Sequence, residues 1–253
     1  MSLENKVAII TGATGGIGFA VAKRLGKDGY TVVLNGIEDE AGAKRIEELT
    51  AEGITAEYVG FDVTDDDAVT SNITAIGEKY GKIDLLVNNA GGLGGRSRFE
   101  EMTTEFYRFV MALNLDSAFF ASRAAIPFLK KGKNASIINY TSNAGWNAGG
   151  PGAGIYGTSK AGVHALTRAL AKDLAEYGIR VNAVSPGTID TPFHAKTKET
   201  KPEVFATFKN SILLGRLGEA EEVASVVSFL ASKDASFITA ETIQIGGGQA
   251  LGI

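Results

Sequence analysis

Short apolar segments alternate with segments of helical period along almost all of the 253-residue chain, and this alternation constrains the fold more than any other feature. Apolar residues recur at helical spacing after the first segment, at Ile17, Val21 and Leu25. Strands that alternate with helices are joined by right-handed crossovers and lie parallel, which leaves a doubly wound open sheet or a closed eight-fold barrel. Seven segments predict buried strands: 6–11, 31–35, 54–61, 83–87, 135–140, 179–184 and 242–245.

The longer segments between these strands predict the helices. Thr64 and Asp67 have the spacing of a capping box at the start of one of them. No Pro/Ser-rich linker interrupts the chain, so we expect a single domain over 1–253. Pro192 and Pro202 break the stretch from 188 to about 214 into short pieces, which predicts a substrate lid. Helical periodicity is clearest over 41–51, 69–80, 106–129, 156–177 and 223–231.

The loop after the first strand decides between the two architectures. Thr11-Gly12-Ala13-Thr14-Gly15-Gly16-Ile17-Gly18 places glycines at a G-x-x-x-G-x-G spacing just before a helix. Glycines there allow a tight turn and let the backbone approach a pyrophosphate at the helix N-terminus. An ordinary glycine turn is the alternative, but the position favours a doubly wound Rossmann fold that binds a nucleotide through Gly12, Thr14, Gly16, Ile17 and Gly18.

The end of the second strand bears on which dinucleotide would bind. Glu38 lies 20 residues after Gly18, where an acidic side chain accepts hydrogen bonds from the adenosine ribose. No Lys or Arg occurs between Gly29 and Ala43, so the charges favour NAD(H) over NADP(H). Glu38 could equally be an acid that starts a solvated helix, which leaves NADP(H) open.

Composition excludes several classes of protein. The chain has no cysteine, so it has no disulfide scaffold, thiolate zinc site or cysteine nucleophile, and we predict no metal site. A net charge of −4 and a pI near 5.4 argue against a nucleic-acid partner. No apolar run approaches the roughly 18 residues of a membrane span, and the N-terminus lacks a leader pattern. We therefore expect a cytoplasmic protein with no membrane partner.

Tyr156 and Lys160 place a phenol and an ammonium on one face of the predicted helix. By itself this pair means little, because chance alone predicts about 0.4 such pairs in a chain of this composition. Other motifs have to support a catalytic interpretation.

Four further motifs occur along the chain. Ser142 precedes Tyr156 and Lys160, and three groups follow the third, fourth and sixth predicted strands: Asp62-Val63, Asn88-Asn89-Ala90-Gly91 and Ser185-Pro186-Gly187. With the glycine loop and these motifs, the chain resembles the classical short-chain dehydrogenases/reductases over essentially its whole length.

The resemblance implies a role for each matching residue. Tyr156 would be the general acid/base, Lys160 would lower its pKa and bind the nicotinamide ribose, and Ser142 would orient the substrate carbonyl. Ser142 lies one residue further from Tyr156 than the family spacing, but Gly145 follows it as the family pattern requires. Asn114 would hold a water in a proton relay to Lys160. The remaining residues expected to bind the cofactor are Asp62, Val63, Asn89, Ala90, Gly91, Pro186, Gly187, Thr188 and Thr191.

Three loops suggest a substrate. The segments 91–96, 149–157 and 185–194 resemble the bacterial reductases of alginate breakdown. That resemblance implies a keto uronate substrate, 4-deoxy-L-erythro-5-hexoseulose uronate, whose aldehyde would be reduced to give 2-keto-3-deoxygluconate.

Three side chains in or near these loops are candidate substrate ligands. Arg96 could clamp the carboxylate, although a surface arginine is the alternative. His194 could contact hydroxyl groups or belong only to the lid, and Trp146 could line the pocket or pack in the core. His164 is expected to be structural, and Thr191 could simply be a helix N-cap before Pro192.

Two other functions remain open on the sequence. The chain could be a 3-oxoacyl (acyl-carrier) or sugar reductase of the same family, or a dinucleotide-binding module without turnover. The family resemblance also implies a homotetramer formed through the long helices and the C-terminal segment 246–253.

Overall fold

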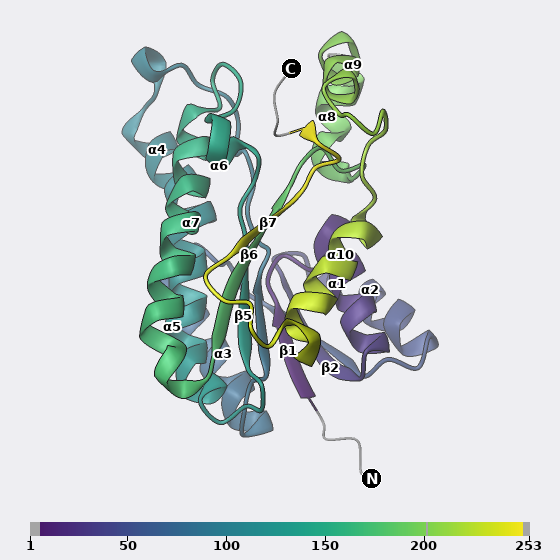
Figure 1. Ribbon diagram of the computed structural model, residues 1–253, viewed down its shortest axis with the longest axis vertical. Helices are drawn as coiled ribbons and strands as arrows, with labels where there is room; N and C mark the ends of the chain where they lie inside the picture. Colours follow the sequence, from purple (N-terminus) through teal and green to yellow (C-terminus); the bar gives the residue numbers. More distant parts are fainter. Residues whose placement is uncertain (1–5, 201, 250–253) are drawn as a thin grey trace.

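The computed structural model describes residues 6–200 and 202–249. Its seven strands form one parallel sheet in the order β3-β2-β1-β4-β5-β6-β7, so the expected doubly wound Rossmann fold is confirmed. Figure 1 shows helices on both faces of this sheet. The strands are β1 (Lys6–Ile10), β2 (Tyr30–Gly36), β3 (Ala56–Gly60), β4 (Leu85–Asn88), β5 (Ser136–Tyr140), β6 (Arg180–Pro186) and β7 (Thr242–Ile245).

Alternate residues of each central strand enter two different cores. On β1, Ala8 and Ile10 pack into one core, and Val7 and Ile9 pack into the other. The first core is covered by α1 (Gly16–Lys27), α2 (Asp39–Ala51) and α10 (Ala220–Ala231). The second is covered by α3 (Asp66–Tyr80), α5 (Ser117–Leu129) and α7 (Gly154–Leu174). Because both faces are buried, the strands read as continuous apolar runs.

Short helices flank the carboxyl ends of the strands. In Figure 1, α4 (Thr104–Met111) and α6 (Ala144–Asn147) lie on one side of that end, and α8 (Ala195–Thr200) and α9 (Pro202–Asn210) lie on the other. A 3₁₀ turn, Pro192–His194, precedes α8, so both prolines of the expected lid begin a short helix. These elements surround the edge of the sheet where ligands bind in doubly wound folds.

The helix expected over 106–129 is interrupted. A π-helical turn, Ala112–Asp116, separates α4 from α5, with the N–H of Ser117 bonded to the carbonyl of Ala112. Such turns insert one residue into a helix and are frequent at functional sites. Asn114 lies within this turn and is buried.

One further sequence expectation, the capping box before α3, needs correction. The start of α3 is capped by Asp65, whose carboxylate accepts from the N–H of Ala68 at 3.1 Å, so Thr64 and Asp67 do not form a capping box. Thr64 instead donates to Asp62 at 2.8 Å.

The run Thr104–Leu129 is long and apolar enough, by length and composition, to cross a membrane. Its buried apolar residues in α5, from Ala121 to Leu129, belong to the second core, which is the environment of a core helix. Residues 250–253 of the expected oligomer segment lie outside the described residues.

Candidate functional site

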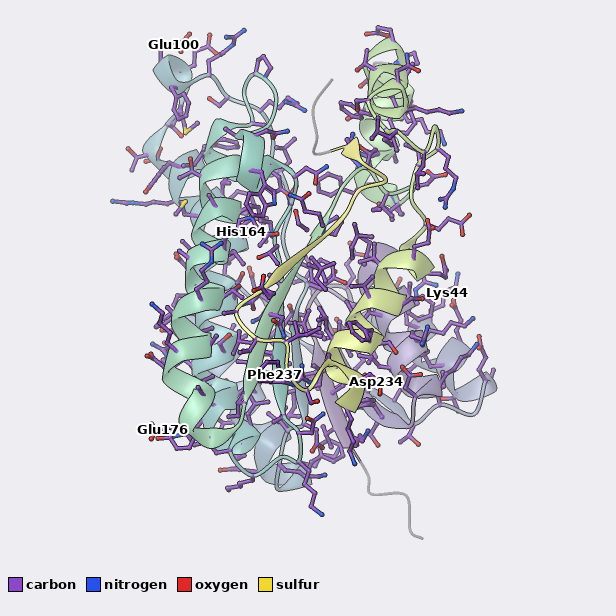
Figure 2. The ribbon with its side chains drawn as sticks, viewed as in Figure 1. Lys44, Glu100, His164, Glu176, Asp234 and Phe237 are labelled. Atoms are coloured by element: carbon purple, nitrogen blue, oxygen red, sulfur yellow. The ribbon has the colours of Figure 1, made fainter. Side chains whose placement is uncertain are left out.

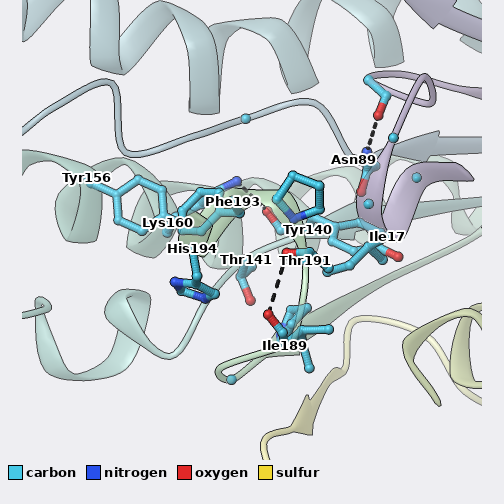
Figure 3. A pocket seen from close by; sticks show the side chains of 18 residues that line it. Ile17, Asn89, Tyr140, Thr141, Tyr156, Lys160, Ile189, Thr191, Phe193 and His194 are labelled. Atoms are coloured by element: carbon cyan, nitrogen blue, oxygen red, sulfur yellow. Dashed lines mark hydrogen bonds between the residues drawn. The ribbon is translucent and has the colours of Figure 1, made fainter. Parts of the chain in front are cut away.

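A cavity of about 330 Å³ opens where the carboxyl ends of the central strands meet the N-terminus of α1 (Figure 3). Strand order reverses between β1 and β4, and this switch point is the usual ligand site of a doubly wound sheet. Residues from the glycine loop, the ends of β4, β5 and β6, α7 and the lid line the cavity: Gly12, Gly15, Gly16, Ile17, Gly18, Asn89, Gly91, Tyr140, Thr141, Tyr156, Lys160, Pro186, Gly187, Ile189, Thr191, Pro192, Phe193 and His194.

The glycine loop has the geometry that a pyrophosphate requires. Gly12 has φ +62°, and a Cβ there would lie 2.9 Å from the Cα of Ala90. A Cβ on Gly18 would collide with the carbonyl of Gly12. Gly15 caps α1 without a side-chain hydrogen bond, so the first N–H groups of the helix are left to an anion. The residues present therefore fit the dinucleotide that the fold implies.

Three polar side chains hold this loop to the neighbouring strands. Asn35 accepts from the N–H of Gly12 at 3.3 Å and donates to the carbonyl of Phe61 at 2.9 Å. Asn89 donates to the carbonyl of Gly12 at 2.9 Å, and the hydroxyl of Thr11 accepts from its N–H at 3.1 Å. Because these partners are far apart in sequence, the sheet itself shapes the loop.

Tyr156 lies at the opposite end of the cavity, on the first turn of α7. Burial raises the pKa of its phenol, and a hydrogen bond with Ser142 lowers it by a smaller amount. The expected effect of Lys160 on this pKa stays a prediction. The ammonium of Lys160 lies 5.9 Å from the ring centroid of Tyr156 and donates to the carbonyl of Tyr140 at 2.9 Å.

Lys160 is itself fully buried. Burial lowers the pKa of its ammonium from 10.5 to about 8, because the charged form loses solvation. Asn114 lies nearby: a Cβ on Gly91 would be 2.8 Å from its Oδ1 and 2.9 Å from Nζ of Lys160. The Asn114 amide accepts from the N–H of Gly92 at 2.9 Å and donates to its carbonyl at 2.8 Å. Asn114 therefore shapes the loop beside Lys160.

The structure places one cation, Arg45, beside the glycine loop, in addition to the residues that the sequence predicts to contact the adenosine part of the dinucleotide. Glu38 is exposed in the turn between β2 and α2, where it is the N-cap residue of α2, and it does not line the cavity. Arg45 donates to the carbonyl of Thr14 at 2.9 Å. It lies two residues after Ala43, where the segment without Lys or Arg ends. Asp62 is exposed after β3, and Val63 is buried in the second core. The charge argument for NAD(H) is weakened by Arg45.

The loop after β6 divides between two environments. Pro186, Gly187 and Thr191 line the cavity, and the Cβ of Thr191 lies 3.7 Å from a Cβ built on Gly16. Thr191 precedes a 3₁₀ turn but makes no side-chain capping bond to it. Its side chain faces the glycine loop instead. Thr188 does not line the cavity, because its N–H and hydroxyl contact the side chain of Gln249.

The three substrate candidates are in different surroundings. His194 lines the cavity, and burial lowers the pKa of its imidazole. Arg96 is exposed, and its Nη1 donates to the carbonyl of Pro151 at 3.0 Å. Trp146 is half exposed and packs against His164 with ring centroids 4.4 Å apart, so it neither lines the cavity nor lies in the core. His164 contacts Thr242 at 3.1 Å, as a structural histidine would.

Sequence reasoning missed some of the cavity wall. Tyr140, Thr141, Ile189 and Phe193 line it but were not among the expected residues. The position of Tyr140 and Thr141 at the carboxyl end of a parallel strand was a usable signal. Figure 3 shows Phe193 and His194 together on the lid segment. No group of three or more metal-ligating side chains occurs within 6–200 and 202–249.

Comparisons with known proteins agree with this geometry. A family model described as Enoyl-(Acyl carrier protein) reductase matches residues 12–250. The 3-oxoacyl-[acyl-carrier-protein] reductase FabG of Thermotoga maritima is 41% identical over 251 residues, which is 98% of this chain and 99% of that protein.

Two solved structures are similar to this chain in overall fold. An actinorhodin polyketide ketoreductase variant with NADPH superposes with a TM-score of 0.91 at 32% identity, covering 98% of each chain. A Serratia marcescens short-chain dehydrogenase/reductase variant has the same TM-score at 29% identity, covering 99% of this chain and 100% of the other.

Proposed function

Because this chain belongs to the short-chain dehydrogenase/reductase family, whose members are NAD(P)-dependent oxidoreductases, we propose that it reduces the carbonyl group of a small molecule. One observation carries the proposal. Tyr156 and Lys160 line one end of a cavity whose other end is the glycine loop, and Ser142 is hydrogen-bonded to Tyr156. A phenol, a buried cation and a dinucleotide cradle are the groups that carbonyl reduction needs.

Each of these residues has a separate task in the proposed reaction. A bound nicotinamide would supply the hydride. Tyr156 donates its proton to the carbonyl oxygen, and its raised pKa keeps the phenol protonated at neutral pH. Ser142 orients that oxygen through its hydroxyl, and the Lys160 ammonium favours the phenolate left after proton transfer.

For the substrate, we propose a 3-oxoacyl thioester first. The name of the Thermotoga relative and the polyketide ketoreductase structure both support a 3-oxo group beside a thioester carbonyl. The keto uronate of alginate breakdown is the second candidate. It is favoured by His194 in the cavity wall and by the exposed guanidinium of Arg96, five residues after Gly91. No comparison reported above bears on the keto uronate.

The test is a substrate and cofactor screen. Loss of NADH and NADPH absorbance is followed with an acetoacetyl thioester and, separately, with the keto uronate released by an exolytic alginate lyase. Turnover of the thioester alone supports the first candidate, and turnover of the uronate alone supports the second. A matched Arg96→Gln variant should raise KM for the uronate and leave KM for the thioester unchanged. If wild-type protein turns over neither substrate, both substrate assignments are wrong.

Binding without turnover is the remaining alternative from another class of protein. A Tyr156→Phe variant keeps the fold and loses only the phenolic hydroxyl. If that variant binds the dinucleotide and is as active as the wild type, the catalytic assignment fails.

We further propose a cytoplasmic homotetramer. Phe109 on α4 and Phe119 on α5 expose large apolar side chains, as does Phe237 before β7 (Figure 2). Large apolar side chains that are exposed in one subunit are candidates for contacts between subunits. Light scattering coupled to size exclusion measures the assembly, and a monomer at micromolar concentration would refute the proposal.

A further inference from the structure

Gln249, in the segment after β7, joins three loops that are distant in sequence. Its Oε1 accepts from the N–H of Thr188 at 2.9 Å and from Nδ2 of Asn143 at 3.2 Å. Its Nε2 donates to the hydroxyls of Thr188 at 2.9 Å and Ser211 at 3.1 Å. One amide therefore connects the loop after β6, the loop after β5 and the end of the lid segment.

Two of these partners, Thr188 and Asn143, are next to residues of the site. Thr188 lies between Gly187 and Ile189, which both line the cavity. Asn143 follows Ser142, the hydrogen-bond partner of Tyr156. A Cβ on Gly187 would lie 2.7 Å from Oε1 of Gln249, so this loop is packed directly against the amide. Gln249 does not itself line the cavity, so it supports the wall from behind.

We propose that Gln249 is a positioning residue that holds the loop after β6 in the conformation that binds the dinucleotide, and holds the lid against it. The inference rests on the proposed carbonyl reduction only for the measurement of KM and kcat. Without the amide, the Thr188 N–H and the Asn143 amide lose an acceptor, and the loop gains conformations that do not bind ligand. The cost of ordering it then appears as weaker dinucleotide binding.

The chain contains a built-in fluorescent reporter of the loop after β5, which Gln249 contacts through Asn143. Trp146 is the only tryptophan, and it lies three residues after Asn143. Its indole packs against His164 and donates to the hydroxyl of Ser185 at 3.3 Å. Because half of the side chain is shielded, loosening of the loop after β5 increases access of a neutral quencher such as acrylamide.

The experiment compares three variants of the full chain. Gln249→Leu removes the amide at similar size, and Gln249→Glu keeps the acceptors for Thr188 and Asn143. Gln244→Leu is the matched control, since Gln244 is exposed on β7. Acrylamide quenching of Trp146, dinucleotide affinity by calorimetry with NADH and with NADPH, and steady-state kinetics are measured for each.

For Gln249→Leu, which removes the hydrogen bonds to Thr188, Asn143 and Ser211, we expect about tenfold higher KM and Kd for the dinucleotide, with kcat within about threefold. The factor is no larger because only part of the stabilisation from these bonds acts on the dinucleotide-binding loop. Quenching of Trp146 should increase in parallel. Gln249→Glu should recover dinucleotide affinity to within about threefold of wild type, and Gln244→Leu should match wild type.

Several results would overturn the proposal. One is a folded Gln249→Leu variant with wild-type dinucleotide affinity and quenching. Another is an equal loss of affinity in Gln244→Leu, and a third is no recovery in Gln249→Glu. If no substrate is turned over but affinity and quenching change as expected, the positioning role stands and the proposed reaction fails.

Discussion

Replacing Lys160 by methionine tests, through protein stability, how strongly burial disfavours the ammonium at this position. The pKa of this ammonium falls from 10.5 to about 8 on folding, because burial removes water from the charged form. Each pKa unit corresponds to about 1.4 kcal/mol, so burying the charged form costs on the order of 3 kcal/mol at neutral pH.

The sign follows from proton binding. Between the folded and unfolded pKa values the unfolded chain holds the proton and the folded chain has released it. The free energy of unfolding of the wild type therefore rises with pH in this window, and the contribution of Lys160 is least favourable below pH 8. From about pH 6.5 to about pH 10 the rise due to this group amounts to about 2.5 kcal/mol.

Methionine keeps most of the side-chain volume and cannot titrate. Lys160→Met should therefore gain stability relative to wild type at neutral pH, and the advantage should shrink by about 2.5 kcal/mol by pH 10. Loss of the hydrogen bond to the carbonyl of Tyr140 subtracts a pH-independent amount of about 1 kcal/mol. Other groups titrate alike in both proteins and cancel.

The assay is urea unfolding followed by circular dichroism at matched protein concentration across this pH range. Equal m-values confirm that the same surface is exposed in both proteins. A difference between variant and wild type that stays constant within about 0.5 kcal/mol over the whole range would refute the desolvation argument.

Three further predictions follow from the site. Tyr156→Phe should lower kcat by about a thousandfold or more while leaving dinucleotide Kd within about twofold, measured by absorbance and calorimetry; a kcat close to wild type would contradict the acid assignment. Asn35→Ala should lower the free energy of unfolding by about 2 kcal/mol and weaken dinucleotide binding, because it removes hydrogen bonds to Gly12 and Phe61. Chemical denaturation measures the stability and calorimetry measures the dinucleotide Kd; unchanged values would show that Asn35 does not hold the loop. Arg45→Met should raise Kd for NADPH by about tenfold and change Kd for NADH by less than about threefold, since only NADPH carries the 2′-phosphate; equal changes for both would make Arg45 a support of the loop alone.

Much of the site follows from local spacing, which a sequence displays directly. Tyr156 and Lys160 are four residues apart on one helix, so any helix over this segment places both side chains on the same face. The glycines after β1 similarly predict a tight turn at a helix N-terminus, and Gly12 and Gly16 have the positive φ angles that such a turn uses.

Charges that meet across the fold could not be predicted in the same way. Arg45 lies 31 residues from Thr14, and no pattern along the chain indicates that its guanidinium reaches the glycine loop. The direction of the pKa of Tyr156 is a similar case, because it depends on burial and on the hydrogen bond with Ser142. Sequence spacing places two groups near one another but does not measure their solvation.

The parallel α/β fold, the glycine loop and the helical pair of phenol and ammonium could all be predicted from the sequence, because each depends on a short repeat of apolar, glycine or polar positions. The contacts of Thr188 with Gln249 and of Arg96 with Pro151 are visible only in the folded structure. These partners are 61 and 55 residues apart, and their contact depends on the packing of whole elements. Hydrogen bonds over such separations form only after the sheet has brought its strand ends together, so no local period records them.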